Sequence, residues 1–145
     1  MKITVDDVVR EVRKLATKYP DFNYKNQEGV DNGGMSCSYL AGMTSTQYKD
    51  SALSKSGLTY NEARSKGILG KGCIVGQALT RLGVPDEALY EYEHMGADYA
   101  VGSNVEPSDS HNYNKLVWLL VVQSLQDEGN NWAESVLRAD KQVKL

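Results

Sequence analysis

The amino-acid sequence predicts a single, mainly helical domain with a buried central helix, a long polar segment rich in loops, and room for one small β element. Apolar residues recur at helical spacing in 5–16 and 73–82, and they follow one another almost without interruption in 116–125. Residues 24–71 are instead rich in Ser, Gly, Asn and Lys. We find no repeat or linker, so we expect residues 1–145 to fold as one unit.

The first helix is expected to begin after Thr4 and to end before Pro20. Thr4 and Asp7 have the spacing of a capping box, and a proline disfavours the helical conformation of the residue that precedes it. The apolar positions that share one face of this helix are Val5, Val8, Val9, Val12, Leu15 and Ala16. This stripe predicts that the helix packs against the core along its whole length.

The loop-rich segment, residues 24–71, carries weaker structural signals. The sequence Asp-Asn-Gly-Gly at 31–34 is typical of a turn, and 37–40 is a candidate for a short strand. Thr59 opens a capping-box pattern that predicts a short helix through Ser65. Long segments with few apolar residues are often functional in compact domains, so we expect a binding surface here.

Two helices are expected to follow. Residues 73–82 place Ile, Val, Ala and Leu on one side, and Gly83 stands where a helix commonly ends. Pro85 then suits the first position of another short helix, and the acidic residues after it favour a helix N-terminus. Residues 104–114 read as a polar connector.

The central helix is predicted over 113–127, where apolar residues cover almost the whole circumference for two turns. Such a helix is buried on all sides, either inside the domain or at the seam of a dimer. Gln123, Gln126 and Asp127 lie along one side of it. They form a solvent-facing stripe, a buried hydrogen-bond network or ligand contacts in a dimer cleft, and we favour the first. Asn131 then caps a last amphipathic helix.

The charge balance argues against nucleic-acid binding. The chain has 19 acidic and 16 basic residues, a formal net charge of −3, and no run of Lys or Arg longer than two. Nucleic-acid binders derive most of their affinity from basic residues that neutralise phosphates. We therefore expect no nucleic-acid partner.

The hydropathy pattern also excludes a membrane helix. The longest apolar run covers residues 116–122, whereas a membrane span needs about 20 residues. The N-terminal sequence has no apolar stretch of the signal-peptide kind, so we expect a cytoplasmic protein with two reduced cysteines.

A cysteine-dependent active site is the main enzymatic hypothesis. Cys73 as nucleophile with His94 or His111 as base would supply the necessary groups. Cys73 also begins an apolar helix face, where a thiol is usually a small buried hydrophobe. The four residues Cys37, Cys73, His94 and His111 lack the close pairs of a structural zinc site. We therefore expect no catalytic residue, no metal and no other cofactor.

A glycine-rich stretch at 70–76 leads into a helix start and contains Lys71. It lacks the spacing of a nucleotide-hydrolysing phosphate loop. It could hold an anion at the helix start, or it could be a flexible hinge, the interpretation that we favour.

Tyrosine is unusually frequent, with nine residues against one phenylalanine, and several lie in the loop-rich segment. Tyrosines suit stacking against flat ligands, although surface tyrosines without a partner are equally common. Our candidate ligand-binding residues are Tyr24, Tyr39, Tyr60, Lys71 and Gln77.

Several segments resemble small proteins encoded by bacteriophages and actinobacteria. The resemblance rests on Gly-Cys-Ile-Val-Gly-Gln-Ala-Leu at 72–79, Leu-Gly-Val-Pro at 82–85 and the Gln, Asp, Gly and Trp-Ala pattern in 123–133, with support from 5–20. It leaves Met43 to Gly70 as an insertion. This resemblance implies a phage context and no mechanism.

Two functional hypotheses follow from the sequence. The first is a non-enzymatic phage accessory protein that binds a small-molecule ligand, such as a nucleotide-derived signal, or a host protein, and thereby counters host defence. The alternative is a cysteine-dependent enzyme that uses Cys73 and a histidine. In either case we expect a homodimer or higher homo-oligomer whose contact includes the helix at 113–127.

Overall fold

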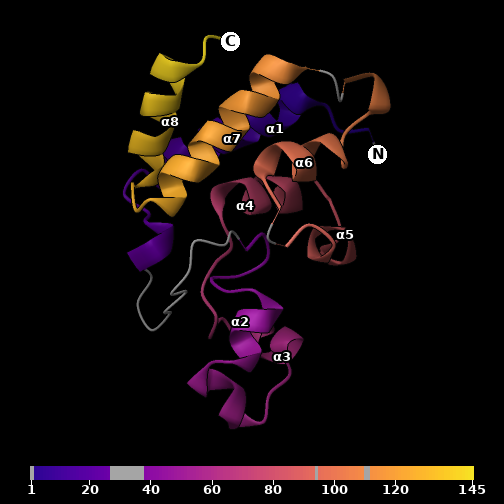
Figure 1. The fold of residues 1–145 in the computed structure, drawn as a ribbon, viewed down its shortest axis with the longest axis vertical. Coiled ribbons are helices and arrows are strands. Elements are labelled where there is room, and N and C mark those ends of the chain that lie inside the picture. Colours follow the sequence, from indigo (N-terminus) through magenta and orange to yellow (C-terminus); the bar gives the residue numbers. More distant parts are fainter. Residues whose placement is uncertain (1, 27–37, 94, 110–111) are drawn as a thin grey trace.

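A computed structural model describes residues 2–26, 38–93, 95–109 and 112–145. Within these ranges the chain is mainly helical and has no strand (Figure 1), which confirms the predicted fold class. The α-helices are α1 (Val5–Lys18), α2 (Ser45–Lys49), α3 (Tyr60–Ser65), α4 (Ile74–Arg81), α5 (Asp86–Tyr90), α6 (Ala97–Gly102), α7 (Tyr113–Asp127) and α8 (Trp132–Gln142). The 3-10 helices are η1 (Tyr24–Asn26), η2 (Ala52–Ser56) and η3 (Pro107–Asp109).

Helix α1 forms as its sequence predicts. The Thr4 hydroxyl accepts a hydrogen bond from the Asp7 backbone N–H, and the Asp7 carboxylate accepts one from the Thr4 backbone N–H. The bond from the Thr4 backbone N–H to the carboxylate is the chief cause that lowers the pKa of Asp7 below its usual value. All six apolar positions named above are buried, and the helix packs against α4, α7 and α8.

Helix α7 is the central helix, with α6 and α8 on its flanks and α1 and α4 also against it (Figure 1). Trp118, Leu119 and Val122 are fully buried. Burial inside the domain is incomplete, because Tyr113 is 70% exposed and Val117 is 44% exposed, so burial of the whole helix at the seam of a dimer stays a prediction. The neighbouring helices cover most of the circumference and leave one apolar face open.

The polar side chains on α7 also differ from the favoured interpretation. Gln126 is fully buried and Gln123 is 3% exposed, so they do not form a solvent-facing stripe. The Gln126 Oε1 atom accepts hydrogen bonds from the Ile74 backbone N–H at 2.8 Å and from the Trp132 indole N–H at 2.9 Å. Its Nε2 atom donates to Asp127 Oδ1 at 3.0 Å. Gln126 is therefore the centre of a buried network that joins α4, α7 and α8.

Residues 41–69 form a small lobe at the end of the molecule opposite α7 and α8 (Figure 1). This lobe is more ordered than the expected loop-rich segment, because α2, η2 and α3 surround a hydrophobic cluster of their own. The cluster consists of Ala41, Met43, Tyr48, Ala63 and Leu69. Capping boxes at Thr44 and Thr59 begin α2 and α3, the second of them as predicted.

The two chain segments that connect the small lobe to the rest of the protein, which we call the body, run side by side. The Gly42 N–H donates to the Leu69 carbonyl at 2.7 Å, and the Cys73 N–H donates to the Ser38 carbonyl at 2.9 Å. Residues 38–40 are nevertheless irregular rather than a strand. Cys37 and the expected turn at 31–34 lie outside the described residues.

Candidate functional site

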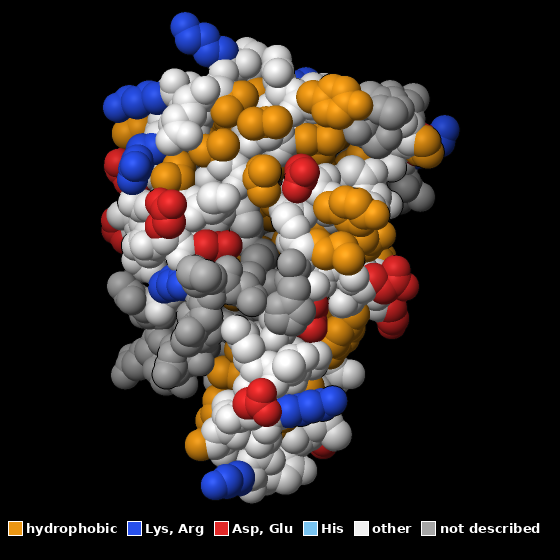
Figure 2. All heavy atoms as spheres, viewed as in Figure 1, with side chains coloured by type: hydrophobic (Ala, Val, Ile, Leu, Met, Phe, Trp, Pro, Cys, Tyr) orange, Lys and Arg blue, Asp and Glu red, His pale blue; other side chains and the backbone are white. Residues whose placement is uncertain are grey.

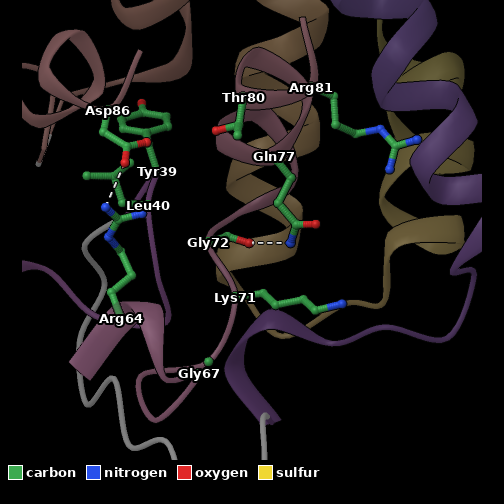
Figure 3. Close-up of a pocket in the computed structure, with 11 residues that line it drawn as sticks. Tyr39, Leu40, Arg64, Gly67, Lys71, Gly72, Gln77, Thr80, Arg81 and Asp86 are labelled. Carbon is green, nitrogen blue, oxygen red and sulfur yellow. Dashed lines mark hydrogen bonds and ion pairs between the residues drawn. The ribbon is translucent and has the colours of Figure 1, made fainter. Parts of the chain in front are cut away.

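A cleft with a cavity of about 350 Å³ opens between the small lobe and helix α4 (Figure 3). The lobe contributes α3, and the body contributes the exposed face of α4 and the start of α5. We call it the basic cleft, because three of its side chains are cationic and one is anionic. It is lined by Tyr39, Leu40, Arg64, Gly67, Gly70, Lys71, Gly72, Gln77, Thr80, Arg81 and Asp86.

The floor of the cleft depends on a close approach between two backbones. A Cβ atom on Gly72 would lie 2.5 Å from the Tyr39 carbonyl oxygen, and one on Gly76 would lie 2.1 Å from it. Only glycine leaves room for the Tyr39 backbone at these two positions. The expectation of a flexible hinge at 70–76 is therefore wrong for both residues, which are buried and fixed by packing.

The start of α4 is also closed to an anion at its first residue. The Ile74 N–H, which a bound anion would use, already donates to Gln126, and Cys73, Ile74 and Val75 are fully buried. Lys71 stands two positions before this buried start and is exposed. An anion placed in the cleft would therefore meet side chains rather than the Ile74 N–H.

The three cationic side chains reach the cleft from different elements. Arg64 of α3 forms an ion pair with Asp86 of α5 at 2.7 Å, across the gap between lobe and body. Arg81 of α4 pairs with Glu11 of α1 at 2.7 Å, and its own side chain is 47% exposed. Lys71 holds its ammonium nitrogen 5.4 Å from the centre of the Tyr19 ring.

These groups divide the basic cleft into two ends (Figure 3). Lys71 and Arg81 extend to the same side of α4, away from Arg64 and Asp86. Gln77 lies between the two groups, and its Nε2 donates to the Gly72 carbonyl at 2.7 Å, which leaves Oε1 on the other side of the amide. Among the described residues of the lining, Asp86 is the only acidic one. One end is thus cationic, and the other holds a carboxylate beside a guanidinium.

Three of the five predicted ligand-binding residues, Tyr39, Lys71 and Gln77, line this cleft. The other two do not. Tyr24 is 1% exposed, and its hydroxyl accepts a hydrogen bond from the Ser38 N–H at 3.1 Å. Tyr60 is half-buried in the small lobe and donates to the Met43 carbonyl at 2.7 Å. Burial also raises the pKa of the Tyr60 hydroxyl.

Tyr39 contributes to the cleft more through its backbone than through its phenol. The residue is 1% exposed, and its hydroxyl donates to the Met95 carbonyl at 2.5 Å. Its ring is therefore not arranged as an open stacking surface. Three further lining residues were not predicted from the sequence, because no motif connects them and only the fold brings them together: Arg64, Arg81 and Asp86.

No family model, curated protein or solved structure matches this chain. Geometry and chemistry therefore carry the functional argument.

The alternative hypothesis, a cysteine-dependent enzyme, needs a cysteine and a histidine, and the structure describes only the cysteine. Cys73 is fully buried, whereas His94 and His111 lie outside the described residues. Among the described residues no group of three or more His, Cys, Asp or Glu side chains could hold a metal ion. None of the described helices has the length and hydropathy needed to span a membrane.

Proposed function

We propose that this protein is a non-enzymatic binding protein whose basic cleft holds a small anionic ligand, with a nucleotide-derived signal as the class that fits best. The observation that carries this proposal is the placement of Lys71 and Arg81 at one end of a cavity of about 350 Å³, whose other end holds Arg64 paired with Asp86 (Figure 3). Arginine matches phosphate oxygens with paired donors, and lysine adds a mobile point charge.

The size and lining of the cleft support a nucleotide-sized ligand. Ligand pockets usually measure roughly 300–1,000 Å³, so a cavity of about 350 Å³ lies at the lower end of that range. Gln77 and Asp86 add an amide and a carboxylate that can bind neutral polar groups. A ligand that combines a phosphate with a sugar or base would use both kinds of contact.

The biological role that we propose follows from the resemblance to phage-encoded proteins. A phage protein that binds a nucleotide-derived signal in the host cytoplasm would lower its free concentration and so counter a defence that depends on it. Sequestration requires binding without turnover, and a fully buried Cys73 thiol is poorly placed for nucleophilic attack on a ligand.

Thermal unfolding with a panel of cyclic and linear nucleotides tests this proposal. A ligand at about 100 times its Kd adds about 2.7 kcal/mol of stability, which is a clear shift in Tm. Lys71→Gln should weaken binding by about tenfold, because a charge-assisted contact to phosphate is lost. Lys66→Gln is the matched control, since Lys66 is exposed in the small lobe and does not line the cleft. Absence of any shift across the panel would refute the ligand-binding proposal.

We also propose that α7 forms the contact of a homodimer. Tyr113 and Val117 are exposed on its open face, and Leu120 and Val121 follow them at helical spacing and are half-buried. Hydrophobic side chains gather on this side of the molecule (Figure 2). Two copies that pack these faces together about a twofold axis would bury them. The same face would suit a host protein if the chain is monomeric.

Light scattering at micromolar concentration tests the dimer. We expect twice the chain mass of 16.0 kDa for the unmodified protein, and a monomer for Val117→Glu. Leu137→Glu is the matched control, because Leu137 is 52% exposed on α8, where it lines a hollow between α8 and α1. A mass near 16.0 kDa for the unmodified protein would refute the dimer, and a dimer that tolerates Val117→Glu would place the contact elsewhere.

A further inference from the structure

Within the part of the chain that the structure describes, the basic cleft has one carboxylate, which lies at one end, and this placement bears on which ligands can enter. Asp86 is the first residue of α5, and its side chain is 42% exposed. Its Oδ2 atom accepts a hydrogen bond from the Arg64 guanidinium at 2.7 Å. A carboxylate offers about four lone-pair positions, so this one contact leaves most of its acceptor capacity for a ligand.

Asp86 is held in place by the fold rather than by the ligand. Pro85 precedes α5 as its N-cap with extended backbone, and the acidic first turn suits the positive end of the helix dipole. Arg64, which is 23% exposed, anchors the carboxylate from the lobe side. The carboxylate is therefore a preorganised acceptor at a defined position in the cleft.

The opposite end of the cleft attracts an anion. Lys71 and Arg81 both extend toward that end, on the other side of Gln77 from Asp86 (Figure 3). In a cavity of about 350 Å³, one nucleotide with its phosphate at Lys71 would place its sugar or base near Asp86. The group that meets Asp86 would then be a hydroxyl or an amine.

We infer that Asp86 is a specificity-determining residue, which selects ligands that end in an uncharged hydrogen-bond donor opposite their phosphate and rejects ligands that carry a second phosphate there. This inference rests on the proposed function of the cleft. A sugar hydroxyl pair can donate to the carboxylate, whereas a second phosphate would meet a like charge and would have to compete with Asp86 for the Arg64 guanidinium, which is already paired at 2.7 Å. The selection thus combines an attractive contact with a repulsive one.

Titration calorimetry with three probes tests the inference. The probes are the nucleoside 5′-monophosphate with the largest melting shift, its 2′,3′-dideoxy analogue, and the corresponding 3′,5′-bisphosphate. We expect the unmodified protein to bind the other two probes about tenfold more weakly than the monophosphate. The dideoxy analogue loses its hydrogen bond to the Asp86 carboxylate, and the bisphosphate places a second phosphate beside that carboxylate.

Asp86→Asn should bring the three affinities to within about threefold of one another, because the amide no longer repels phosphate and accepts hydrogen bonds less strongly. Glu87→Gln is the matched control: it removes the same charge from the next residue of α5, which does not line the cleft, and should keep the preference. The ratio of affinities is the readout, so a general gain in anion binding by Asp86→Asn does not obscure it.

The outcomes separate this inference from the proposed function. Equal binding of all three probes by the unmodified protein, or an unchanged preference in Asp86→Asn, would overturn the role of Asp86 and leave nucleotide binding intact. Binding confined to ligands with phosphates at both ends would also overturn it. If no nucleotide binds, the proposed function fails and the inference fails with it.

Discussion

Gly76→Ala tests the close approach on which the floor of the cleft depends. A Cβ atom at this position would lie 2.1 Å from the Tyr39 carbonyl oxygen and 2.5 Å from the Tyr39 Cα. Both atoms belong to the backbone, so no side-chain rotation relieves the contact. The Tyr39 segment must withdraw until these distances reach at least 3.0 Å. That movement strains the hydrogen bond between the Cys73 N–H and the Ser38 carbonyl.

The expected loss of stability follows from three contributions. Overpacking of a tight interior costs about 1–3 kcal/mol, and the upper end applies because backbone meets backbone. A buried N–H without a partner costs about 1–3 kcal/mol. Alanine in place of glycine inside a helix stabilises the folded state by about 1 kcal/mol, which offsets part of this loss. We therefore expect Gly76→Ala to lower the free energy of unfolding by about 3–5 kcal/mol.

Urea unfolding followed by circular dichroism measures this change, and a thermal scan should show a Tm about 10 °C lower. Gly102→Ala is the matched control, because Gly102 is the last residue of α6 and a Cβ atom there meets nothing within 4 Å. That variant should be neutral or up to about 1 kcal/mol more stable. Equal stability of Gly76→Ala and the unmodified protein would refute the close-approach argument.

Three further predictions concern the interior. Gln126→Leu should lower the free energy of unfolding by about 2–4 kcal/mol in urea titrations, because the Ile74 N–H and the Trp132 indole N–H lose their acceptor; a change below 1 kcal/mol would contradict the network. Burial raises the pKa of Asp127 from 3.8 to about 6, so the folded state binds its proton more tightly and stability falls as the pH rises between these values. Asp127→Asn should flatten the dependence of Tm on pH between 4 and 7 and raise Tm above pH 6, and an unchanged slope would disprove the assignment. Cys73 is fully buried and should react with iodoacetamide only after unfolding, as mass spectrometry of the labelled peptide would show; rapid labelling of the native protein would revive the cysteine-dependent alternative.

The long helices were predictable because their signals are local. Thr4 and Asp7 define the start of α1 through a capping box, and the Asn131 side chain caps α8 by accepting the Glu134 N–H at 2.8 Å. Apolar periodicity then fixes which face is buried. Both kinds of signal lie within a few residues of the element that they describe.

The small lobe was not predictable in the same way. Its cluster is assembled from single apolar residues such as Met43, Tyr48 and Leu69, which are separated by polar sequence and share no period. Periodicity detects a stripe on one element, and none of the lobe's short helices is long enough to show one. The tyrosines of this segment therefore looked exposed, although Tyr48 is 4% exposed within the cluster.

The polar side of α7 shows a similar limit. Glutamine on a helix is usually exposed, and only the positions of Ile74 and Trp132 make a buried Gln126 favourable, because both donate to it. The candidate site shows the same dependence on residues that are distant in sequence. Lys71 and Gln77 lie near one another in sequence and were identified, whereas Arg64 and Asp86 meet only through the packing of α3 near α5.

The paired backbone segments at the base of the small lobe hold the two ends of the lobe together. Because the Gly42 and Leu69 backbones are bonded to each other, the chain between them begins and ends at one place. Closing a loop costs only about 0.6 kcal/mol more for each doubling of its length. Sequence inserted or removed between these two points would therefore change one wall of the cleft while the α4 floor and the helical core stay as they are.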